Sequence, residues 1–220
     1  MAWDKVWDDI YKKSAWGKYP PEELIRFFAK NFYNVKNRKE IKVLDIGCGP
    51  GSGSGWFIAR EGFDYYGVDG SKIAINRAKN KFREEKLSGK FTICDFESLP
   101  FENNLFDAVI DVAALMCNTE SATKKIIKEI FRVLKKDGLH FSHTPKNGCW
   151  GEGTGERIDE TTYSNITEGP FANMGIVRFT TIENIKDLYN DFSNLEINYI
   201  SYTRNNMKEI ISHWIINCTK

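Results

Sequence analysis

The sequence lacks two features that would assign a protein to a class at once. It has almost no excess charge, because 31 Lys and Arg residues are matched by 30 Asp and Glu residues. It also has no apolar run of the roughly 18 residues that a transmembrane helix requires. A balanced charge offers no broad attraction to nucleic acid or to an anionic membrane surface. We therefore expect partners of neither kind.

Cysteine is scarce and irregularly spaced. The five cysteines are odd in number, and none of them belongs to a C-x-x-C pair. This spacing predicts neither a disulfide framework nor a zinc site, so we expect reduced thiols and no bound metal. The opening residues, MAWDKVWDDIYKK, carry acidic side chains where a signal peptide has an uninterrupted apolar stretch. Together these patterns predict a cytoplasmic protein.

Apolar segments of two lengths alternate along the chain. Short apolar runs closed by turn residues are typical of buried parallel strands, and the longer amphipathic runs between them are typical of helices. The short runs lie at residues 40–46, 65–69, 90–94, 106–112 and 139–144. Two closing strands follow at residues 194–203 and 207–219. The pattern predicts an α/β fold: a Rossmann-like, doubly wound, mostly parallel seven-stranded sheet with a C-terminal antiparallel strand.

The sharpest motif is VLDIGCGPG at residues 43–51. Its glycines allow a tight turn after a strand and let backbone amides face a ligand beside a helix N-terminus. No window satisfies G-x-G-x-x-G or G-x-x-x-x-G-K-[ST], which disfavours a pyrophosphate or triphosphate ligand. Asp45 lies inside the strand, where a carboxylate repels a phosphate and suits an ammonium or a sulfonium. S-adenosylmethionine carries both cations, so the motif favours it as the ligand.

Residues 41–145 resemble the class I S-adenosylmethionine-dependent methyltransferases, of the small methyltransferase-domain type. The likeness rests on VLDIGCGPG, GVDGS, CDFESLPF, FDAVIDVAALM and IFRVLKKDG. It implies that S-adenosyl-L-methionine is bound and that S-adenosyl-L-homocysteine is the product. The cofactor residues that it implies are Asp45, Gly47, Cys48, Gly49 and Gly51 for the methionine part, Asp69, Gly70 and Ser71 for ribose and adenine, Asp95 and Phe96 for adenine, and Asp111, Val112 and Met116 beside the sulfonium.

A structural interpretation of the acids stands beside this one. Each of them also suits a capped turn, a helix N-cap or a hydrogen-bonded strand end: Asp45, Asp69, Asp95 and Asp111. The chain also departs from the family pattern in two places. It has Asp111-Val112 where members often have a small or polar residue followed by Asn. Gly53 and Gly55 are extra glycines.

The resemblance also implies how a single methyltransferase domain is arranged over residues 1–220. We expect an N-terminal helical lid at residues 1–40, a cofactor-binding core at 41–145, an inserted substrate loop at 146–178, and a closing helix and strands at 179–220. The insertion is glycine-rich and polar, and a stretch of this length inside a compact domain is typical of a binding loop.

A few aromatic and histidine residues are candidates for the acceptor side. His143 lies at the carboxyl end of the fifth strand, where this architecture binds ligands, and we expect it to act as a general base and an acceptor contact. His140, inside the strand, suits a hydrogen-bonded core position. Trp16 and Tyr19 in WGKYP are candidate lid residues, and Trp150 is a candidate acceptor contact from the insertion.

These observations predict an enzyme that transfers a methyl group to a small-molecule acceptor. By analogy with similar methyltransferases, the acceptor is a sugar or an amine of a glycan or natural-product pathway, with the sugar favoured. Two alternatives stay open. A nucleotide-dependent oxidoreductase uses the same kind of sheet, and a non-catalytic S-adenosylmethionine-binding module keeps the pocket without the transfer. The oligomeric state cannot be read from the sequence.

Overall fold

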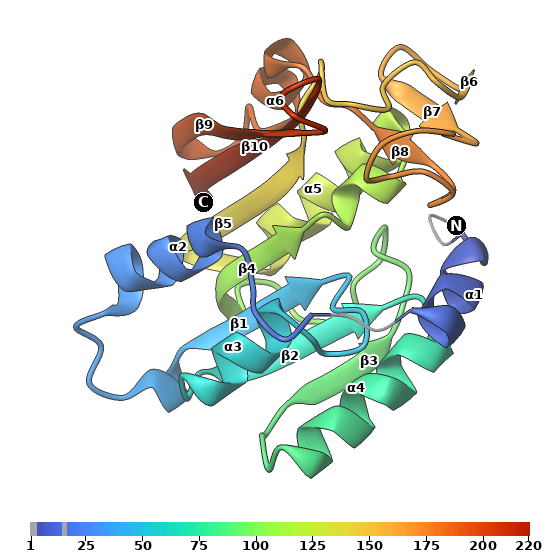
Figure 1. The fold of residues 1–220 in the computed structure, drawn as a ribbon. Coiled ribbons are helices and arrows are strands. Elements are labelled where there is room, and N and C mark those ends of the chain that lie inside the picture. Colours follow the sequence, from blue (N-terminus) through green and yellow to red (C-terminus); the bar gives the residue numbers. More distant parts are fainter. Residues whose placement is uncertain (1–3, 15–16) are drawn as a thin grey trace.

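The fold is one long sheet with helices on both faces (Figure 1). The computed structural model describes residues 4–14 and 17–220. The main sheet has seven strands in the order β3-β2-β1-β4-β5-β10-β9. Strands β1 to β5 run parallel to one another, whereas β10 is antiparallel to both of its neighbours, β5 and β9. The predicted Rossmann-like α/β sheet with a C-terminal antiparallel strand is confirmed.

The elements have the following bounds. The strands of the main sheet are β1 (Lys42–Ile46), β2 (Asp64–Asp69), β3 (Lys90–Ile93), β4 (Phe106–Val112), β5 (Leu134–Pro145), β9 (Ser193–Arg204) and β10 (Glu209–Thr219). A small second sheet holds β6 (Glu156–Arg157), β7 (Thr162–Ser164) and β8 (Val177–Arg178). The helices are α1 (Val6–Lys13), α2 (Glu22–Phe32), α3 (Ser54–Arg60), α4 (Lys72–Glu84), α5 (Glu120–Val133) and α6 (Ile182–Leu188), with 3₁₀ turns η1 (Arg38–Glu40) and η2 (Leu115–Cys117).

Two apolar layers hold the helices against the sheet. On one face, α2, α3 and α4 pack on side chains such as Val43 and Ile110. On the other face, α5 and α6 pack on the alternate side chains, such as Leu44 and Val109. Successive side chains of a strand point to opposite faces, so a strand covered on both sides is apolar throughout. This is why the short apolar runs located the strands.

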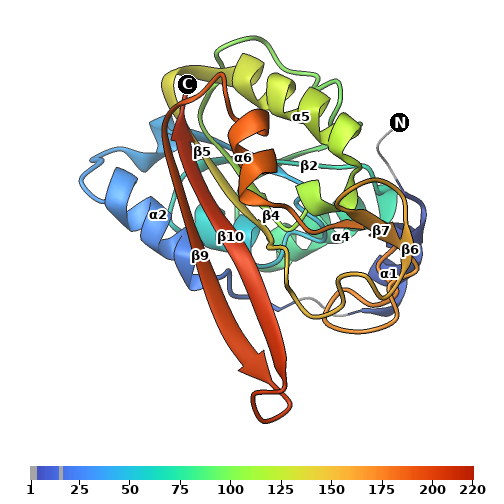
Figure 2. The ribbon, with the colours of Figure 1, turned by 90° about the horizontal axis from the view of Figure 1, so that it is seen from above.

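Three segments lie outside these layers. Helix α1 packs against α4, and the small β6-β7-β8 sheet lies near the carboxyl ends of β4 and β5 (Figure 1). An apolar cluster joins this small sheet to Met116, which follows β4. The hairpin of β9 and β10 extends well past the rest of the sheet (Figure 2). We call its projecting part, residues 199–211, the hairpin arm.

The structure differs from the predicted elements in three places. Strand β5 begins at Leu134, whereas the sequence predicts this strand from residue 139. Helix α6 ends at Leu188, whereas the apolar pattern predicts a helix to residue 192. Asn190 and Asp191 are poor helix formers, and the chain turns there so that Phe192 still packs into the core. The insertion, which shows no periodicity, contains β6 to β8. Among the described residues, no helix combines the length and the apolar character needed to cross a membrane.

Candidate functional site

The glycine-rich turn after β1 brings bare backbone to the carboxyl edge of the sheet. Gly47 and Gly49 have φ angles of +70° and +53°, in the left-handed region that favours glycine. A Cβ at Gly47 would lie 2.2 Å from the Cβ of Ala114. The amides of Gly47 and Cys48 both donate to the carbonyl oxygen of Val68 at 2.9 Å, which ties the turn to the end of β2. No larger residue fits at position 47.

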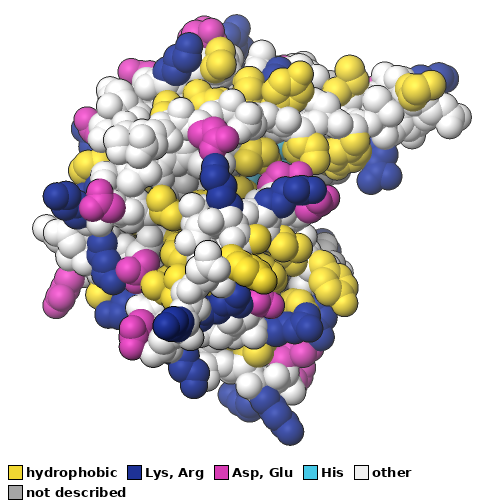
Figure 3. All heavy atoms as spheres, turned by 90° about the vertical axis from the view of Figure 1, so that its left-hand side faces the viewer, with side chains coloured by type: hydrophobic (Ala, Val, Ile, Leu, Met, Phe, Trp, Pro, Cys, Tyr) yellow, Lys and Arg dark blue, Asp and Glu magenta, His cyan; other side chains and the backbone are white. Residues whose placement is uncertain are grey.

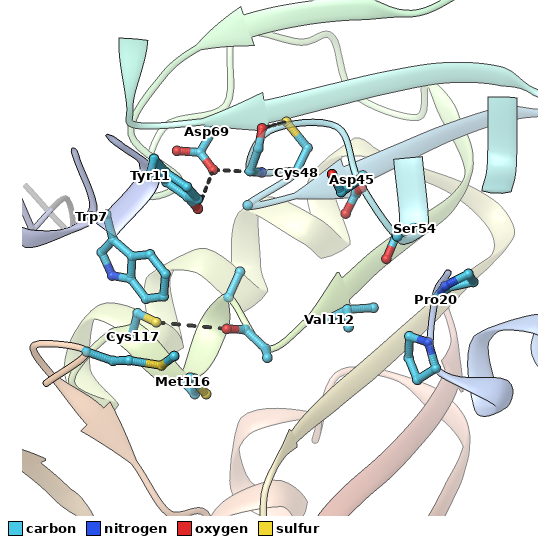
Figure 4. A pocket seen from close by; sticks show the side chains of 18 of the residues that line it. Trp7, Tyr11, Pro20, Asp45, Cys48, Ser54, Asp69, Val112, Met116 and Cys117 are labelled. Atoms are coloured by element: carbon cyan, nitrogen blue, oxygen red, sulfur yellow. Dashed lines mark hydrogen bonds between the residues drawn. The ribbon is translucent and has the colours of Figure 1, made fainter. Parts of the chain in front are cut away.

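A cavity of about 340 Å³ opens between this turn and the segment that follows β4 (Figure 4). It lies where the strand order reverses between β1 and β4, which is where doubly wound sheets bind ligands. The described residues that line it come from α1 and the residues on either side of it, β1 and the glycine turn, the end of β2, the segments after β3 and β4, and the insertion: Asp4, Trp7, Tyr11, Gly17, Tyr19, Pro20, Pro21, Asp45, Gly47, Cys48, Gly49, Ser52, Gly53, Ser54, Asp69, Phe96, Val112, Ala113, Ala114, Met116, Cys117, Asn118, Phe171 and Met174.

Asp45 is a buried carboxyl group at the floor of this cavity. The hydroxyl of Tyr65 donates to its Oδ2 at 2.9 Å. Burial raises the pKa of Asp45 to about 8, because no described cation lies close enough to offset the loss of water. The structure also explains one of the extra glycines, since a Cβ at Gly55 would lie 2.5 Å from the Tyr65 hydroxyl. Gly55 therefore makes room for the hydroxyl that orients Asp45.

Asp69, at the end of β2, holds the second carboxyl group. Its Oδ2 accepts the N–H of Gly49 at 2.9 Å and the hydroxyl of Tyr11 at 3.4 Å, and its Oδ1 accepts the N–H of Ser71 at 2.8 Å. Burial raises its pKa to about 6, and these hydrogen bonds limit the rise. The carboxylate thus joins the glycine turn, α1 and the start of α4 at one point.

Helix α1 closes the cavity on the side of α4. The hydroxyl of Ser71 donates to Asp8, and the guanidinium of Arg77 donates to the carbonyl oxygens of Tyr11 and Ser14. These bonds hold one face of α1 against α4. Trp7 and Tyr11 lie one helical turn apart, and their side chains face the cavity in Figure 4.

The segment after β4 forms the wall opposite the glycine turn. Asp111 is fully buried, and its Oδ1 accepts the N–H groups of Ala114 and Leu115 at 2.8 and 2.9 Å. The hydroxyl of Ser142 donates to its Oδ2 at 2.7 Å. Burial raises the pKa of Asp111 to about 6. Asp111 therefore fixes the backbone of the wall from behind and is absent from the cavity lining.

One end of the cavity is apolar and rich in sulfur. We call it the apolar end, and its side chains are Trp7, Met116, Cys117, Phe171 and Met174. Phe171 and Met174 come from the insertion and belong to the same apolar cluster as Met116. Beside them lies Asn118, whose Nδ2 donates to the carbonyl oxygen of Ala114, while its buried Oδ1 has no hydrogen-bond partner.

The N-terminal segment and the insertion meet above the apolar end. Asp4 accepts the N–H of Val6 through Oδ1 at 3.0 Å. A Cβ at Gly175, which has a φ angle of +77°, would lie 2.6 Å from Asp4 Oδ2 and 2.7 Å from a Val6 methyl group. Gly175 thus lets the backbone of the insertion approach the start of α1 closely.

The charge of the lining is one-sided. The described lining residues include three carboxyl groups, those of Asp4, Asp45 and Asp69, and no Lys, Arg or His. A pocket with such a lining favours cationic groups and disfavours phosphates. Across the described residues, no cluster of three or more His, Cys, Asp or Glu side chains forms a metal site.

The structure brings most of the cofactor residues implied by the sequence to one cavity. Those among its lining residues are Asp45, Gly47, Cys48, Gly49, Asp69, Phe96, Val112 and Met116. Those outside the lining are Gly51, Gly70, Ser71, Asp95 and Asp111. Besides Asp111, three of these have structural contacts: Gly51 packs on Ala78 of α4, Ser71 caps α4, and Asp95 accepts the N–H of Glu97.

Three of the four candidate acceptor residues lie in the described part of the chain, and of these three Tyr19 alone lines the cavity. Trp16 lies outside the described residues. The indole N–H of Trp150 donates to Glu168, and Trp150 does not reach the lining. His143 stacks on His213 with the ring centroids 4.5 Å apart, and it too is absent from the lining.

The surroundings of His143 do not suit a base that titrates near neutrality. Burial, and to a smaller extent the neighbouring His213, lower its pKa to about 3. Its Nδ1 is buried without a hydrogen-bond partner. A general base near neutral pH works best with a pKa close to that pH. The role of His143 stays a prediction that only an experiment can test.

The sequence analysis missed several lining residues. They are Asp4, Trp7, Tyr11, Cys117, Asn118, Phe171 and Met174. Trp7 and Tyr11 carried a partial signal, because aromatic residues four positions apart share one helix face. The sequence does not say whether that face meets the core or a cavity. Phe171 and Met174 lie in the insertion, where no periodic pattern places a side chain.

The central part of the chain matches a known family. The family model of a methyltransferase domain matches residues 43–138. A sterol 24-C-methyltransferase of Pneumocystis carinii (strain B80) is 33% identical over 103 residues, which cover 46% of this chain and 27% of that protein. The matched segments span less than half the length of the curated relatives. An uncharacterized Haemophilus influenzae protein, for example, is matched over 41% of its length.

Solved structures share the fold over most of the chain. A structure described as a SAM-dependent methyltransferase from Methanosarcina mazei has a TM-score of 0.72 at 22% identity, and the match covers 93% of this chain and 99% of that one. A Haemonchus contortus phosphoethanolamine N-methyltransferase, in complex with phosphomonomethylethanolamine and S-adenosylhomocysteine, has a TM-score of 0.64 at 19% identity, covering 90% and 52%. At these identities the likeness shows a common fold.

Proposed function

We propose that this chain, which belongs to the class I S-adenosylmethionine-dependent methyltransferases, transfers a methyl group from S-adenosylmethionine to a small-molecule acceptor. The observation that carries the proposal is the pairing of Asp45 and Asp69 across the bare backbone of Gly47 and Gly49 in one cavity. In this proposal residues 1–40 act as a lid, 41–145 as the cofactor core, 146–178 as the substrate loop, and 179–220 as the closing segment.

The cavity fits the cofactor in charge and in shape. Asp45 is a buried acid whose raised pKa, about 8, reports a missing positive partner, and the ammonium of the cofactor supplies one. Asp69 has its carboxylate at the end of β2, where the ribose hydroxyls of nucleosides bind in such sheets. Phe96 lines the same side and offers an apolar face for adenine. The bare glycine turn leaves room for the ligand to touch backbone amides.

The chain's own residues contribute position and exclusion of water. S-adenosylmethionine supplies a methyl group on a sulfonium that is already activated for nucleophilic attack. The wall of Val112 and Ala113, held from behind by Asp111, borders the space between the glycine turn and the apolar end. Trp7 and Tyr11 cover this space. Holding two reactants in line can lower the barrier by about 7–11 kcal/mol, so no obligatory catalytic side chain is needed.

The proposal is tested first by binding and then by transfer. Titration calorimetry should show that S-adenosylhomocysteine binds and NAD does not. Asp69→Ala should weaken binding by about tenfold or more, because a buried carboxylate that accepts ligand hydroxyls contributes on the order of 1.4 kcal/mol or more. Asp64→Ala, at the opposite end of β2, is the matched control and should bind normally.

Transfer is then followed with methyl-labelled S-adenosylmethionine and pools of candidate acceptors. Label appearing in an acceptor supports the enzyme. Tight S-adenosylhomocysteine binding without any transfer would instead favour the non-catalytic binding module, and NAD binding in its place would favour the oxidoreductase. The acceptor-side roles that the sequence predicts for His143 and Trp150 are tested by the same assay on their alanine variants, and the position of both side chains outside the described lining argues against them.

A further inference from the structure

The charge and polarity of the apolar end of the cavity limit the kinds of acceptor that it can bind. Under the proposed function, the cofactor occupies Asp45 and Asp69. Asp4 is then the one carboxyl group among the described lining residues that no cofactor group uses. Asp4 lies at the apolar end, because a Cβ at Gly175 would lie 2.6 Å from its Oδ2, and because its charge is among the causes that raise the pKa of Cys117.

The side chains around Asp4 are apolar, aromatic or sulfur-containing. Trp7, Phe171 and Met174 surround this end of the cavity, and Met116 and Cys117 complete it. Aromatic faces attract cations, and thioethers pack well against both rings and alkyl groups. The described lining holds no Lys, Arg or His that would bind a phosphate or a carboxylate on the acceptor.

We propose that the acceptor is an amine carried on an apolar or aromatic body, without phosphate or carboxylate groups, and that Asp4 recognises its ammonium. Asn118 supplies a second polar contact on this wall, because its Oδ1 is buried and lacks a donor in the described structure. This inference rests on the proposed function and chooses the amine over the sugar that sequence analogy favoured.

The chemistry of transfer also favours an amine. The ammonium gives one proton to the Asp4 carboxylate, which passes it to solvent. The freed lone pair of nitrogen then forms the bond to the methyl carbon, while the electron pair of the breaking carbon–sulfur bond stays on sulfur. A sugar hydroxyl needs a base of near-neutral pKa to reach comparable reactivity, and the described lining offers no histidine for this role.

The test uses three probes of one shape and different charge. 2-Phenylethylamine, 2-phenylethanol and phenylacetate are titrated into the full chain saturated with S-adenosylhomocysteine, and binding is followed by calorimetry. We expect the amine to bind about tenfold more tightly than the alcohol, and phenylacetate not to bind. Asp4→Asn keeps an oxygen that can accept the Val6 N–H and should abolish the preference for the amine. Asp9→Asn, at an exposed acid of the adjoining helix α1, should retain it.

Each outcome decides something. Equal or tighter binding of the alcohol or of phenylacetate overturns the amine assignment, and so does a lack of amine binding to protein that holds S-adenosylhomocysteine. Both results leave the proposed function intact. A protein that does not bind S-adenosylhomocysteine at all fails the proposed function first and this inference with it. A preference for the amine that survives Asp4→Asn removes Asp4 from the subsite.

A separate observation concerns the far edge of the main sheet. β9 is its terminal strand, and within the described part of the chain it pairs only with β10, so one row of its backbone groups has no described strand beside it. Tyr199 and Tyr202 on this strand are 63% and 43% exposed. β9 contains neither proline nor lysine, the residues that usually protect an edge strand. Apolar side chains also lie on the hairpin arm that projects from the body in Figure 3.

The geometry points to a second copy of this chain as the occupant of the edge. An antiparallel pairing of two β9 strands about a two-fold axis beside Ile200 places Glu196 of each copy opposite Arg204 of the other, and Ile200 opposite Ile200. Both opposite-charge pairs follow from a single register. In this arrangement each hairpin arm lies along the first half of the other copy's β9, which gives the projecting arm a surface to cover (Figure 2).

Sedimentation velocity on the full chain tests this pairing by charge reversal. The wild-type protein should be a dimer, and Arg204→Glu should be a monomer because four like charges then meet. The double variant Glu196→Arg, Arg204→Glu should recover the dimer. Lys208→Glu, in the turn beyond the paired segment, should leave it intact. A monomeric wild type at the highest concentration tested, or a double variant that stays monomeric, overturns the pairing.

Discussion

Asp45 is a single residue whose ionisation should report ligand binding. Its pKa of about 8 keeps it protonated at pH 7 in the empty protein, and a bound ammonium favours the carboxylate. We therefore expect S-adenosylhomocysteine to release nearly one proton per site at pH 7. The measurement is the binding enthalpy in buffers of different ionisation enthalpy. Asp69, with a pKa of about 6, is already mostly ionised at this pH and adds little.

Asp45→Asn separates this effect from other sources of protons. The variant should bind with an enthalpy that no longer depends on the buffer. It should also change stability in a defined direction. Folded Asp45 keeps its proton up to about pH 8, whereas the unfolded chain loses it near pH 3.8, so Asp45 destabilises the empty protein as the pH rises through this window. Asp45→Asn should reduce that decline, and an unaltered decline would contradict the assignment.

His143 gives the second prediction at this scale. With a pKa of about 3 it is neutral throughout the physiological range, and it lies outside the described cavity lining. We expect His143→Gln to lower the melting temperature through the lost stacking on His213 and to change kcat by less than about twofold, with an unaltered pH profile between pH 5 and 8. A fall of roughly 10²-fold in kcat would establish the base role.

At the scale of elements, the contact between the insertion and α1 depends on Gly175. A side chain there collides with Asp4 and Val6 and also meets a strained φ of +77°. Gly175→Ala should separate the two segments, so that the amides of α1 exchange hydrogen faster. Gly153 has the same φ with nothing within 4 Å of a Cβ, so Gly153→Ala carries the strain without the collision. Equal exchange in the two variants would show that the contact does not hold α1.

The elements also show what the sequence could and could not predict. Strands β1, β2 and β4 and the second half of β5 were located because a strand buried on both faces is apolar along its length, and this property is local. The edge strand β3 has no buried residue, so this reason does not apply to it. The face of α1 that meets the cavity was not predicted, because Trp7 and Tyr11 suit a core equally well until α4 is placed beside them. The lining residues of the insertion were also missed, because residues 146–178 have no hydrophobic periodicity that would show which side chains are buried.

The same distinction applies to the site. Asp45 and Asp69 were predicted from their place at strand ends next to glycines, which fixes them at one edge of the sheet. The structure gives other members of the same motifs, such as Gly51 and Asp111, contacts that build the site from outside the cavity. A motif marks the region around a ligand, and the contacts of each residue decide whether it faces the ligand or supports a residue that does.

At the scale of the molecule, the cavity joins four parts that are distant in the sequence: α1, the glycine turn, the segment after β4 and the insertion. A ligand that touches all of them should stabilise the whole fold against heating. At a hundred times its Kd, S-adenosylhomocysteine adds about 2.7 kcal/mol to the free energy of unfolding, which raises Tm by roughly 5–10 °C for a chain of this size. NAD should not shift Tm. In Asp69→Ala, binding that is about tenfold weaker leaves about 1.4 kcal/mol at the same concentration, so the shift should fall to roughly half. The link from the glycine turn to α1 and α4 passes through that carboxylate. A full shift in this variant would mean that the ligand binds elsewhere.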